Sequence, residues 1–185
     1  MEQDTQTQKG FSVLLSLYHK EKASQLNECL GSIFNQTLKP SEVVMVIDGP
    51  IGHELEEVLY SWDSKLPLKV VRLEENVGLG NALNIGLEHC GYELVFRMDT
   101  DDVCLPERFY LQHSEFENNP ELVLLGGHIE EYENDLSTPI SKRLVPVGSE
   151  LIKKECIKRN PFNHVTVAFK KSAVLKVGGY IHHLW

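Results

Sequence analysis

Residues 94–102 read LVFRMDTDD, an apolar strand that runs straight into a cluster of carboxylates. Four of its first five side chains are apolar, which is typical of a strand buried on both faces. Asp99, Asp101 and Asp102 follow directly. Carboxylates this close repel one another, which raises their pKa values unless a positive charge compensates. Because a hard divalent cation with oxygen ligands would supply that charge, the stretch predicts a cation site at a strand end.

The rest of the first hundred residues alternates apolar strands with amphipathic helices. Strands are predicted over 11–17, 43–47, 68–73 and 94–98, and helices over 21–35, 53–62 and 81–89. This order indicates an α/β protein with a mostly parallel sheet flanked by helices. Ligands of such sheets bind beyond the carboxyl ends of the strands. In extended chain, side chains two residues apart point the same way, so we expect Asp99 and Asp101 to face one ion.

After the acidic cluster the regular alternation of strands and helices ends. Pro106 suits the first position of a helix that runs to about residue 118. Short strands and turns are expected over 129–146, a helix over 149–158, and a strand over 165–169. Ser172 is expected to cap a last helix that ends near Gly178.

Bulk composition narrows the class of protein. The 185 residues suit one domain, and 42% hydrophobic and 24% charged residues are ordinary for a soluble protein. The formal net charge of −9 argues against a nucleic-acid partner but not against a nucleotide, because a bound cation can reverse the local sign. The four cysteines lack zinc-site spacing and are interpreted as reduced thiols. The sequence shows no signal peptide or membrane-spanning run, so a cytoplasmic location is predicted.

The acidic cluster and the glycines each have alternative interpretations. A calcium loop beginning at Asp99 fails, since Cys104 and Tyr110 occupy its glycine and glutamate positions. A dinucleotide fingerprint over 76–83 fails because Leu83 replaces the third glycine and two glutamates precede the loop. A solvated acidic turn stays open.

Two further strand ends share the predicted edge with the cluster. Asp48 ends the second strand and Tyr18 the first. By themselves these are a common turn residue and a boundary aromatic, although a tyrosine there could also stack on a base. His164 and Thr166 follow the NPFN sequence at 160–163 and could line a pocket, while a lone histidine is more often structural.

Taken in order, these segments resemble family 2 glycosyltransferases. They are residues 12–18 (SVLLSLY), 29–37 (CLGSIFNQT), 46–49 (VIDG), 76–80 (NVGLG), 97–102 (RMDTDD) with Pro106, Arg108 and Gln112, and 164–166 (HVT). The similarity runs from about Phe11 to Tyr180, and its order and spacing are more specific than any one piece. It implies a GT-A, Rossmann-like fold with a smaller acceptor-side subregion. It also implies an inverting glycosyltransferase that moves a sugar from a nucleotide-diphosphate donor in surface polysaccharide synthesis.

The resemblance also implies roles for single residues. Those on the donor side are Leu17, Tyr18, Glu21, Asp48, Gly78, Arg97 and Asp99. Asp99 and Asp101 would be the Asp-X-Asp pair that holds Mg²⁺ or Mn²⁺, supported by Asp102, while Asn163 and His164 would lie on the acceptor side. The expected partners are a UDP-sugar and a saccharide or lipid-linked acceptor, and a lipid-linked acceptor would bring the protein to the inner membrane face. The expected division is a disordered tail at 1–10, a nucleotide-sugar-binding half at 11–102 and an incomplete acceptor-side half at 103–185.

Four positions depart from the family pattern and leave the donor's identity open. Leu17 replaces a small polar residue, His19 an asparagine, and Ile47 one of two consecutive aspartates. Leu83 stands where many members have an arginine near the donor, so that contact is lost or supplied by Arg97.

The last residues of the sequence depart most from the family pattern. In the family, the Gly-Gly-Tyr region at 178–180 leads into an acidic motif with the catalytic base, but only IHHLW follows here. The base is therefore expected just after Trp185, no catalytic residue is assigned, and the chain is interpreted as truncated. The alternative is a non-catalytic nucleotide-binding module or remnant. A nucleotidyltransferase is less favoured, because residues 16–21 (SLYHKE) lack that class's glycine-rich loop.

Overall fold

A six-stranded sheet forms the centre of the computed structural model, which describes residues 10–133 and 137–180. Its strand order is β3-β2-β1-β4-β8-β5. The parallel strands are β1 (Phe11–Leu17), β2 (Glu42–Ile47), β3 (Leu68–Arg72) and β4 (Leu94–Arg97), and the antiparallel additions are β8 (Ala168–Lys170) and β5 (Leu124–Leu125). The predicted mostly parallel α/β sheet is confirmed.

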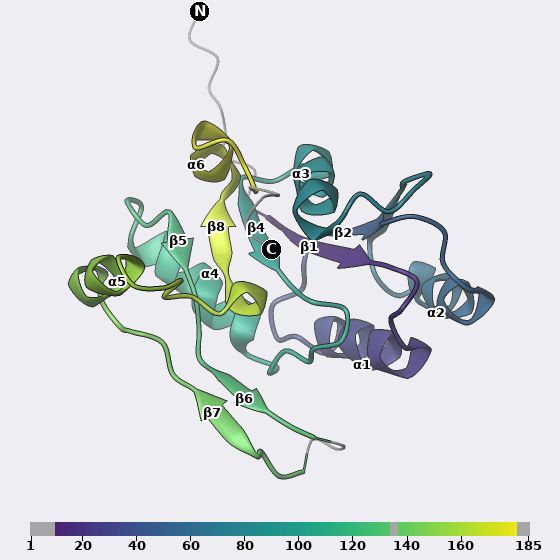
Figure 1. Cartoon of the computed structure of the whole chain (residues 1–185), viewed down its shortest axis with the longest axis horizontal. Helices are drawn as coiled ribbons and strands as arrows, with labels where there is room; N and C mark the ends of the chain where they lie inside the picture. Colours follow the sequence, from purple (N-terminus) through teal and green to yellow (C-terminus); the bar gives the residue numbers. More distant parts are fainter. Residues whose placement is uncertain (1–9, 134–136, 181–185) are drawn as a thin grey trace, which may run out of the picture.

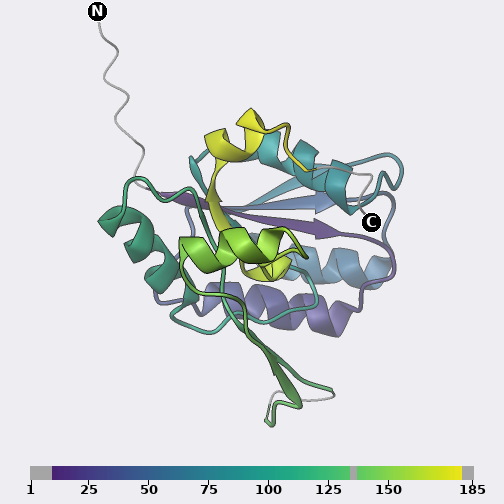
Figure 2. The ribbon, with the colours of Figure 1, turned by 60° about the vertical axis from the view of Figure 1, so that its left-hand side comes forward.

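Helices cover both faces of the sheet (Figures 1 and 2). One face carries α1 (Ala23–Phe34), α2 (His53–Asp63) and α4 (Arg108–Asn118), and the other carries α3 (Leu79–His89) and α6 (Lys171–Lys176). Side chains of β1 alternate between the two cores, Leu15 packing with the first set and Leu14 with the second. Burial on both faces explains why the strands are continuously apolar.

The remaining elements lie beside the sheet. β6 (Ile129–Glu131) and β7 (Ser141–Arg143) form a two-stranded ribbon that projects from the body, and α5 (Ser149–Cys156) packs no buried residue (Figure 1). The short helix η1 (His164–Thr166) precedes β8. None of the helices in the described ranges is long and apolar enough to cross a bilayer.

Several predicted boundaries are wrong in the second half. Val165 and Thr166, expected in a strand, belong to η1, because the Thr166 hydroxyl hydrogen-bonds back to the Asn163 carbonyl at 2.8 Å. Pro106 lies outside α4, whose N-cap is Glu107. Likewise Lys170, not Ser172, is the N-cap of α6. The expected disordered tail falls, apart from Gly10, outside the described residues, and the proposed division at residue 102 stays a prediction.

The antiparallel direction of β8 places η1 beside the end of β4. The Arg97 amide donates to the Val167 carbonyl at 2.8 Å, so residues just before β8 lie at the edge where β4 ends. Residues that follow parallel strands and residues that precede β8 therefore meet at one place.

Candidate functional site

The carboxylates after β4 are presented by a turn. Thr100 and Asp101 lie in that turn, where the Asp102 amide approaches the Asp99 carbonyl at 3.5 Å. The Thr100 hydroxyl donates to the Ser16 carbonyl at 3.4 Å, which fixes the turn against β1. The extended conformation expected over residues 99–101 is wrong, because the strand ends at Arg97 and Thr100 and Asp101 lie in a turn. That Asp99 and Asp101 face one ion stays a prediction.

Arg97 lies beneath this turn. Arg97 is 0% exposed. Its Nη1 forms an ion pair with the Asp99 carboxylate, and the Asp99 side chain is 34% exposed. Among the described residues, the buried Arg97 Nε has no hydrogen-bond partner. A buried cation with an unused donor is costly unless something compensates it, which makes Arg97 a candidate functional residue.

Four carboxylates gather around the turn. Burial raises the pKa of Asp102 to about 6, with the neighbouring Asp99 and Asp101 carboxylates adding to the rise. Burial also raises the pKa of Glu21, and the charges of Asp101, Asp99 and Asp102 act in the same direction. The structure therefore brings Glu21, on the approach to α1, into the same electrostatic environment as the turn.

The chemistry of this cluster fits a hard divalent cation. Within the described ranges, no three His, Cys, Asp or Glu side chains are arranged as a ready metal site. Mg²⁺, however, commonly uses one or two carboxylates together with substrate phosphates and water. Asp101 is exposed and Asp99 partly so, which suits two oxygen ligands completed by a ligand from outside. Their role as ligands stays a prediction.

Asp48 and Gly78 are brought together on the neighbouring side of the edge. The Asp48 residue is 3% exposed, and its carboxylate accepts hydrogen bonds from the Val77 amide (2.7 Å), the Gly78 amide (3.1 Å) and Asn76 Nδ2 (3.0 Å). Gly78 has a φ of +83°, a conformation that favours glycine. Asp48 thus holds the loop at 76–78, and a donor-binding role for either residue stays a prediction.

Leu17 and Tyr18 present different surfaces to this edge. The Leu17 side chain is wholly buried in the core, and its carbonyl accepts the Asp48 amide at 2.8 Å. A bound nucleotide-sugar could therefore contact only the main chain of Leu17. Tyr18 is exposed and could still stack on a base.

Asn163 and His164, which are predicted to lie on the acceptor side, stand at the start of η1: Asn163 is its N-cap and His164 its first residue. Asn163 is buried, and its Nδ2 donates to the carbonyls of Gly127 (3.0 Å) and Arg143 (3.4 Å), which ties two loops together. The His164 ring lies 5.6 Å from the Tyr180 ring. Burial, helped by the positive charge of Arg97, lowers the pKa of His164 to about 4, so the imidazole is neutral at pH 7.

Arg108 is a site residue to which no role was assigned from the sequence. Its Nη2 donates to the carbonyls of Arg97 (2.7 Å) and Val165 (3.0 Å), and burial lowers its pKa to about 10. It therefore joins α4 to the end of β4 and to η1. Arg108 is one of the residues that carry the family resemblance, but nothing in the helical pattern indicates that its side chain points inward.

Comparison with known proteins agrees with this geometry. The family model described as "Glycosyl transferase family 2" matches residues 12–178. Amylovoran biosynthesis glycosyltransferase AmsE of Erwinia amylovora is 48% identical over 175 residues, which are 95% of this chain and 65% of that protein. The Escherichia coli UDP-Gal:alpha-D-GlcNAc-diphosphoundecaprenol beta-1,3-galactosyltransferase is 39% identical over 170 residues, 92% of this chain and 62% of that protein.

The structural likeness points the same way. The crystal structure of S. aureus TarS superposes with a TM-score of 0.70 at 26% identity, covering 92% of this chain and 30% of that one. The GT-A fold implied by the resemblance is therefore confirmed. The chain spans just under two thirds of the length of the two curated relatives. A family match over residues 12–178 and close relatives at 48% and 39% identity establish that the chain belongs to glycosyl transferase family 2.

Proposed function

We propose that this chain binds a nucleotide-diphosphate sugar, with UDP as its nucleotide, for inverting transfer to a saccharide or lipid-linked acceptor in surface polysaccharide synthesis. The observation that carries the proposal is the carboxylate turn at the carboxyl edge of the sheet, backed by the buried Arg97. This is the edge at which open α/β sheets bind ligands. The names of the two relatives, one in amylovoran biosynthesis and one using UDP-Gal, support the same donor and pathway class.

Each part of the edge has a task in this proposal. Tyr18 offers a stacking surface to the base, and the loop held by Asp48 forms the neighbouring wall. Arg97 orients the Asp99 carboxylate through their ion pair, and its buried positive charge partly offsets the negative charges of Asp101 and Asp102. A divalent cation bound at Asp99 and Asp101 would supply positive charge to the leaving diphosphate. We place the reaction in the cytoplasm, at the inner membrane face when the acceptor is lipid-linked.

Calorimetric titration with UDP tests the donor assignment. We expect binding in Mn²⁺ or Mg²⁺ that is lost in EDTA, because the carboxylate cluster repels a bare diphosphate. Asp101→Ala should weaken binding at least about tenfold, the loss expected for a hydrogen bond or contact to a charged group. Asp63→Ala removes the same charge from the end of α2 and should leave binding unchanged.

Two results would contradict the donor assignment. One is a wild-type chain that binds no nucleoside diphosphate with metal present. The other is equal UDP affinity in wild-type and Asp101→Ala chains.

A further inference from the structure

A pocket lies next to η1, on the side predicted to face the acceptor. Its volume is about 390 Å³, which falls within the ~300–1,000 Å³ usual for small-molecule sites. Its lining residues are Arg143, Leu144, Val145, Pro146, Arg159, Asn160, Pro161, Phe162, Asn163 and His164. Two arginines, an apolar wall and His164 therefore share one pocket.

The charge of this region is opposite to that of the rest of the chain. Residues 141–159 carry six Lys or Arg and two Glu, whereas the other residues carry 12 basic and 25 acidic side chains. A third of the chain's cations thus fall in 19 residues; Lys142 and Lys153 are paired with Glu130 and Glu150, and Arg143 and Arg159 line the pocket. Such a concentration of one sign attracts an anionic ligand.

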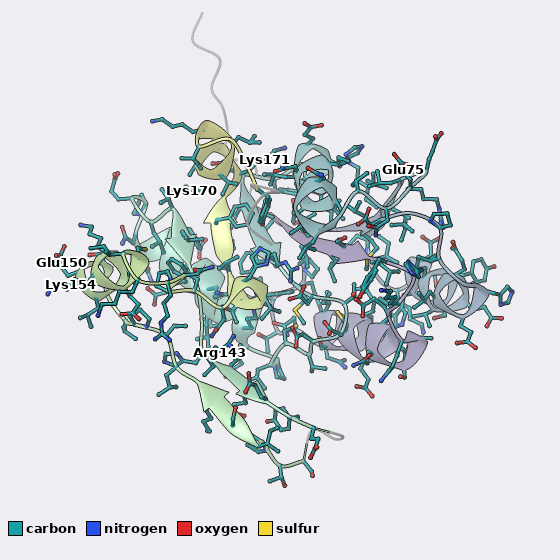
Figure 3. All side chains as sticks on the ribbon, viewed as in Figure 1. Glu75, Arg143, Glu150, Lys154, Lys170 and Lys171 are labelled. Atoms are coloured by element: carbon teal, nitrogen blue, oxygen red, sulfur yellow. The ribbon has the colours of Figure 1, made fainter. Side chains whose placement is uncertain are left out.

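The two arginines retain donors for a ligand. The Arg143 guanidinium makes no hydrogen bond or ion pair with any residue in the described ranges; the Arg143 carbonyl accepts from Asn163 and holds the backbone in place. Figure 3 shows Arg143 at the base of the β6–β7 ribbon, toward η1, while Lys154 points outward from α5. Arg159 uses its Nε on Glu155 at 2.6 Å, which leaves its two terminal nitrogens. Guanidinium groups suit phosphate oxygens because their donors form a planar fork.

The other polar groups of the pocket are already engaged. Asn160 Oδ1 accepts the Phe162 amide at 3.0 Å, and Asn163 Nδ2 is used on main-chain carbonyls. The charged recognition in this pocket therefore falls to Arg143 and Arg159.

Apolar surface continues from the pocket wall to the outside. Leu144 lines the pocket and is 67% exposed, and Val147 farther along the same segment is 73% exposed. An inorganic anion would gain nothing from this surface. A ligand with a phosphate group and an attached hydrocarbon chain would bury it.

The pocket also lies close to the proposed donor site. His164 lines it, and the charges of Arg97 and Asp99 both act on that imidazole. Arg108 holds η1 and the end of β4 together through the Val165 and Arg97 carbonyls. A ligand in the pocket can therefore extend past His164 toward the carboxylate turn.

We propose that this pocket binds the diphosphate of a lipid-linked acceptor, with Arg143 and Arg159 on the phosphate oxygens and the apolar wall on the start of the lipid chain. The inference rests on the proposed function, since it makes the bound molecule the acceptor of the transferred sugar. It assigns the acceptor class by chemistry: an amphipathic diphosphate rather than a neutral saccharide.

Titration with farnesyl diphosphate, a soluble prenyl diphosphate, tests the assignment. The titration is done in EDTA, so that a metal-dependent donor site cannot contribute. We expect affinity to fall in the order farnesyl diphosphate, farnesyl phosphate, farnesol. Arg143→Gln and Arg159→Gln should each weaken farnesyl diphosphate binding about tenfold or more, as for lost hydrogen bonds to a charged group.

Matched variants separate the pocket from general electrostatics. Lys153→Gln/Lys154→Gln removes two charges from the outside of α5, and Arg72→Gln removes one that is paired with Glu56 at the β3 edge of the sheet, opposite β5. Both should leave farnesyl diphosphate affinity within about twofold, and so should Asp101→Ala. Equal loss in the α5 double variant would overturn the assignment. So would phosphatidylglycerol vesicles that compete at the same phosphate concentration, because they would indicate a membrane-docking surface.

Titration of the arginine variants with UDP and Mn²⁺ distinguishes this inference from the proposed function. Normal UDP binding together with arginine-independent farnesyl diphosphate binding would refute the pocket alone. Arginine-dependent farnesyl diphosphate binding without any UDP binding would refute the donor assignment and leave the pocket standing as a prenyl diphosphate site.

Discussion

Arg97 and Asp99 form an ion pair in which the guanidinium is wholly buried while the carboxylate reaches solvent. The buried partner cannot be hydrated, so its charge is directed at the turn. This pair sets the charge balance of the proposed donor site and is the place to test it first.

Arg97→Met should lower the free energy of unfolding at pH 7 by roughly 1–3 kcal/mol, less than for a fully buried pair because Asp99 can be hydrated. Urea denaturation followed by tryptophan fluorescence measures this. Arg72→Met removes an exposed arginine and should cost less than about 1 kcal/mol. The double variant Arg97→Met/Asp99→Asn should be less destabilised than the sum of the single changes, and strict additivity would argue against coupling.

Stability near His164 should depend on pH. Its folded-state pKa of about 4 lies below the ordinary histidine value, so the native chain binds this proton less tightly than the unfolded chain. The contribution is fully present above about pH 6.5 and is lost as pH falls toward 4. His164→Gln should therefore lose less stability than wild type between pH 7 and pH 4.5, measured by denaturation at each pH. Parallel curves for the two proteins would contradict the burial of a neutral imidazole.

Two glycines at the strand edge should respond differently to alanine. Gly49 and Gly78 have φ values of +84° and +83°, so each Ala variant bears a backbone strain of about 1–2 kcal/mol. A Cβ on Gly78 would meet nothing within 4 Å, whereas one on Gly49 would lie 2.7 Å from the Asn76 nitrogen. Gly49→Ala should be the more destabilising change and should also weaken UDP binding by displacing the 76–78 loop. Equal unfolding midpoints would show that the loop yields freely.

The four cysteines should differ in reactivity. Cys29, Cys90 and Cys104 are buried, and burial raises the pKa of each thiol, that of Cys90 to about 12. Cys156 is exposed on the last turn of α5. Ellman's reagent at pH 8 should therefore titrate one thiol in the native chain and four in urea, because thiolates are the reactive form. Cys156→Ser should remove the native reaction, and a remaining fast thiol would contradict the buried placement.

The sequence predicted the first half of the fold well. Strands such as 43–47 and helices such as 53–62 follow directly from apolar runs and helical spacing, which depend on local pattern. The second half is harder to predict from sequence. There η1 forms through hydrogen bonds of the Thr166 hydroxyl to Asn163 and Gly127, which no periodicity of the sequence encodes.

The site shows the same division between local and tertiary information. The cluster at Asp99 was visible as an acidic sequence, but its turn geometry depends on contacts with β1. Arg97 was expected near the donor, while its complete burial depends on tertiary packing, with His164 of η1 and Tyr180 close enough to feel its charge. Arg143 and Arg159 belong to different elements, and their common pocket exists only after folding.

The reversal of β8 separates two regions of the chain. The residues proposed to hold the donor follow parallel strands, so they are fixed by the same register that builds the core. The residues proposed to face the acceptor precede an antiparallel strand, and the ribbon and α5 that lead into it contribute little to the sheet. Under this assignment, insertions or exchanges between residues 126 and 163 would change acceptor recognition and leave the proposed donor site unchanged. Acceptor recognition could then diverge in evolution independently of donor binding.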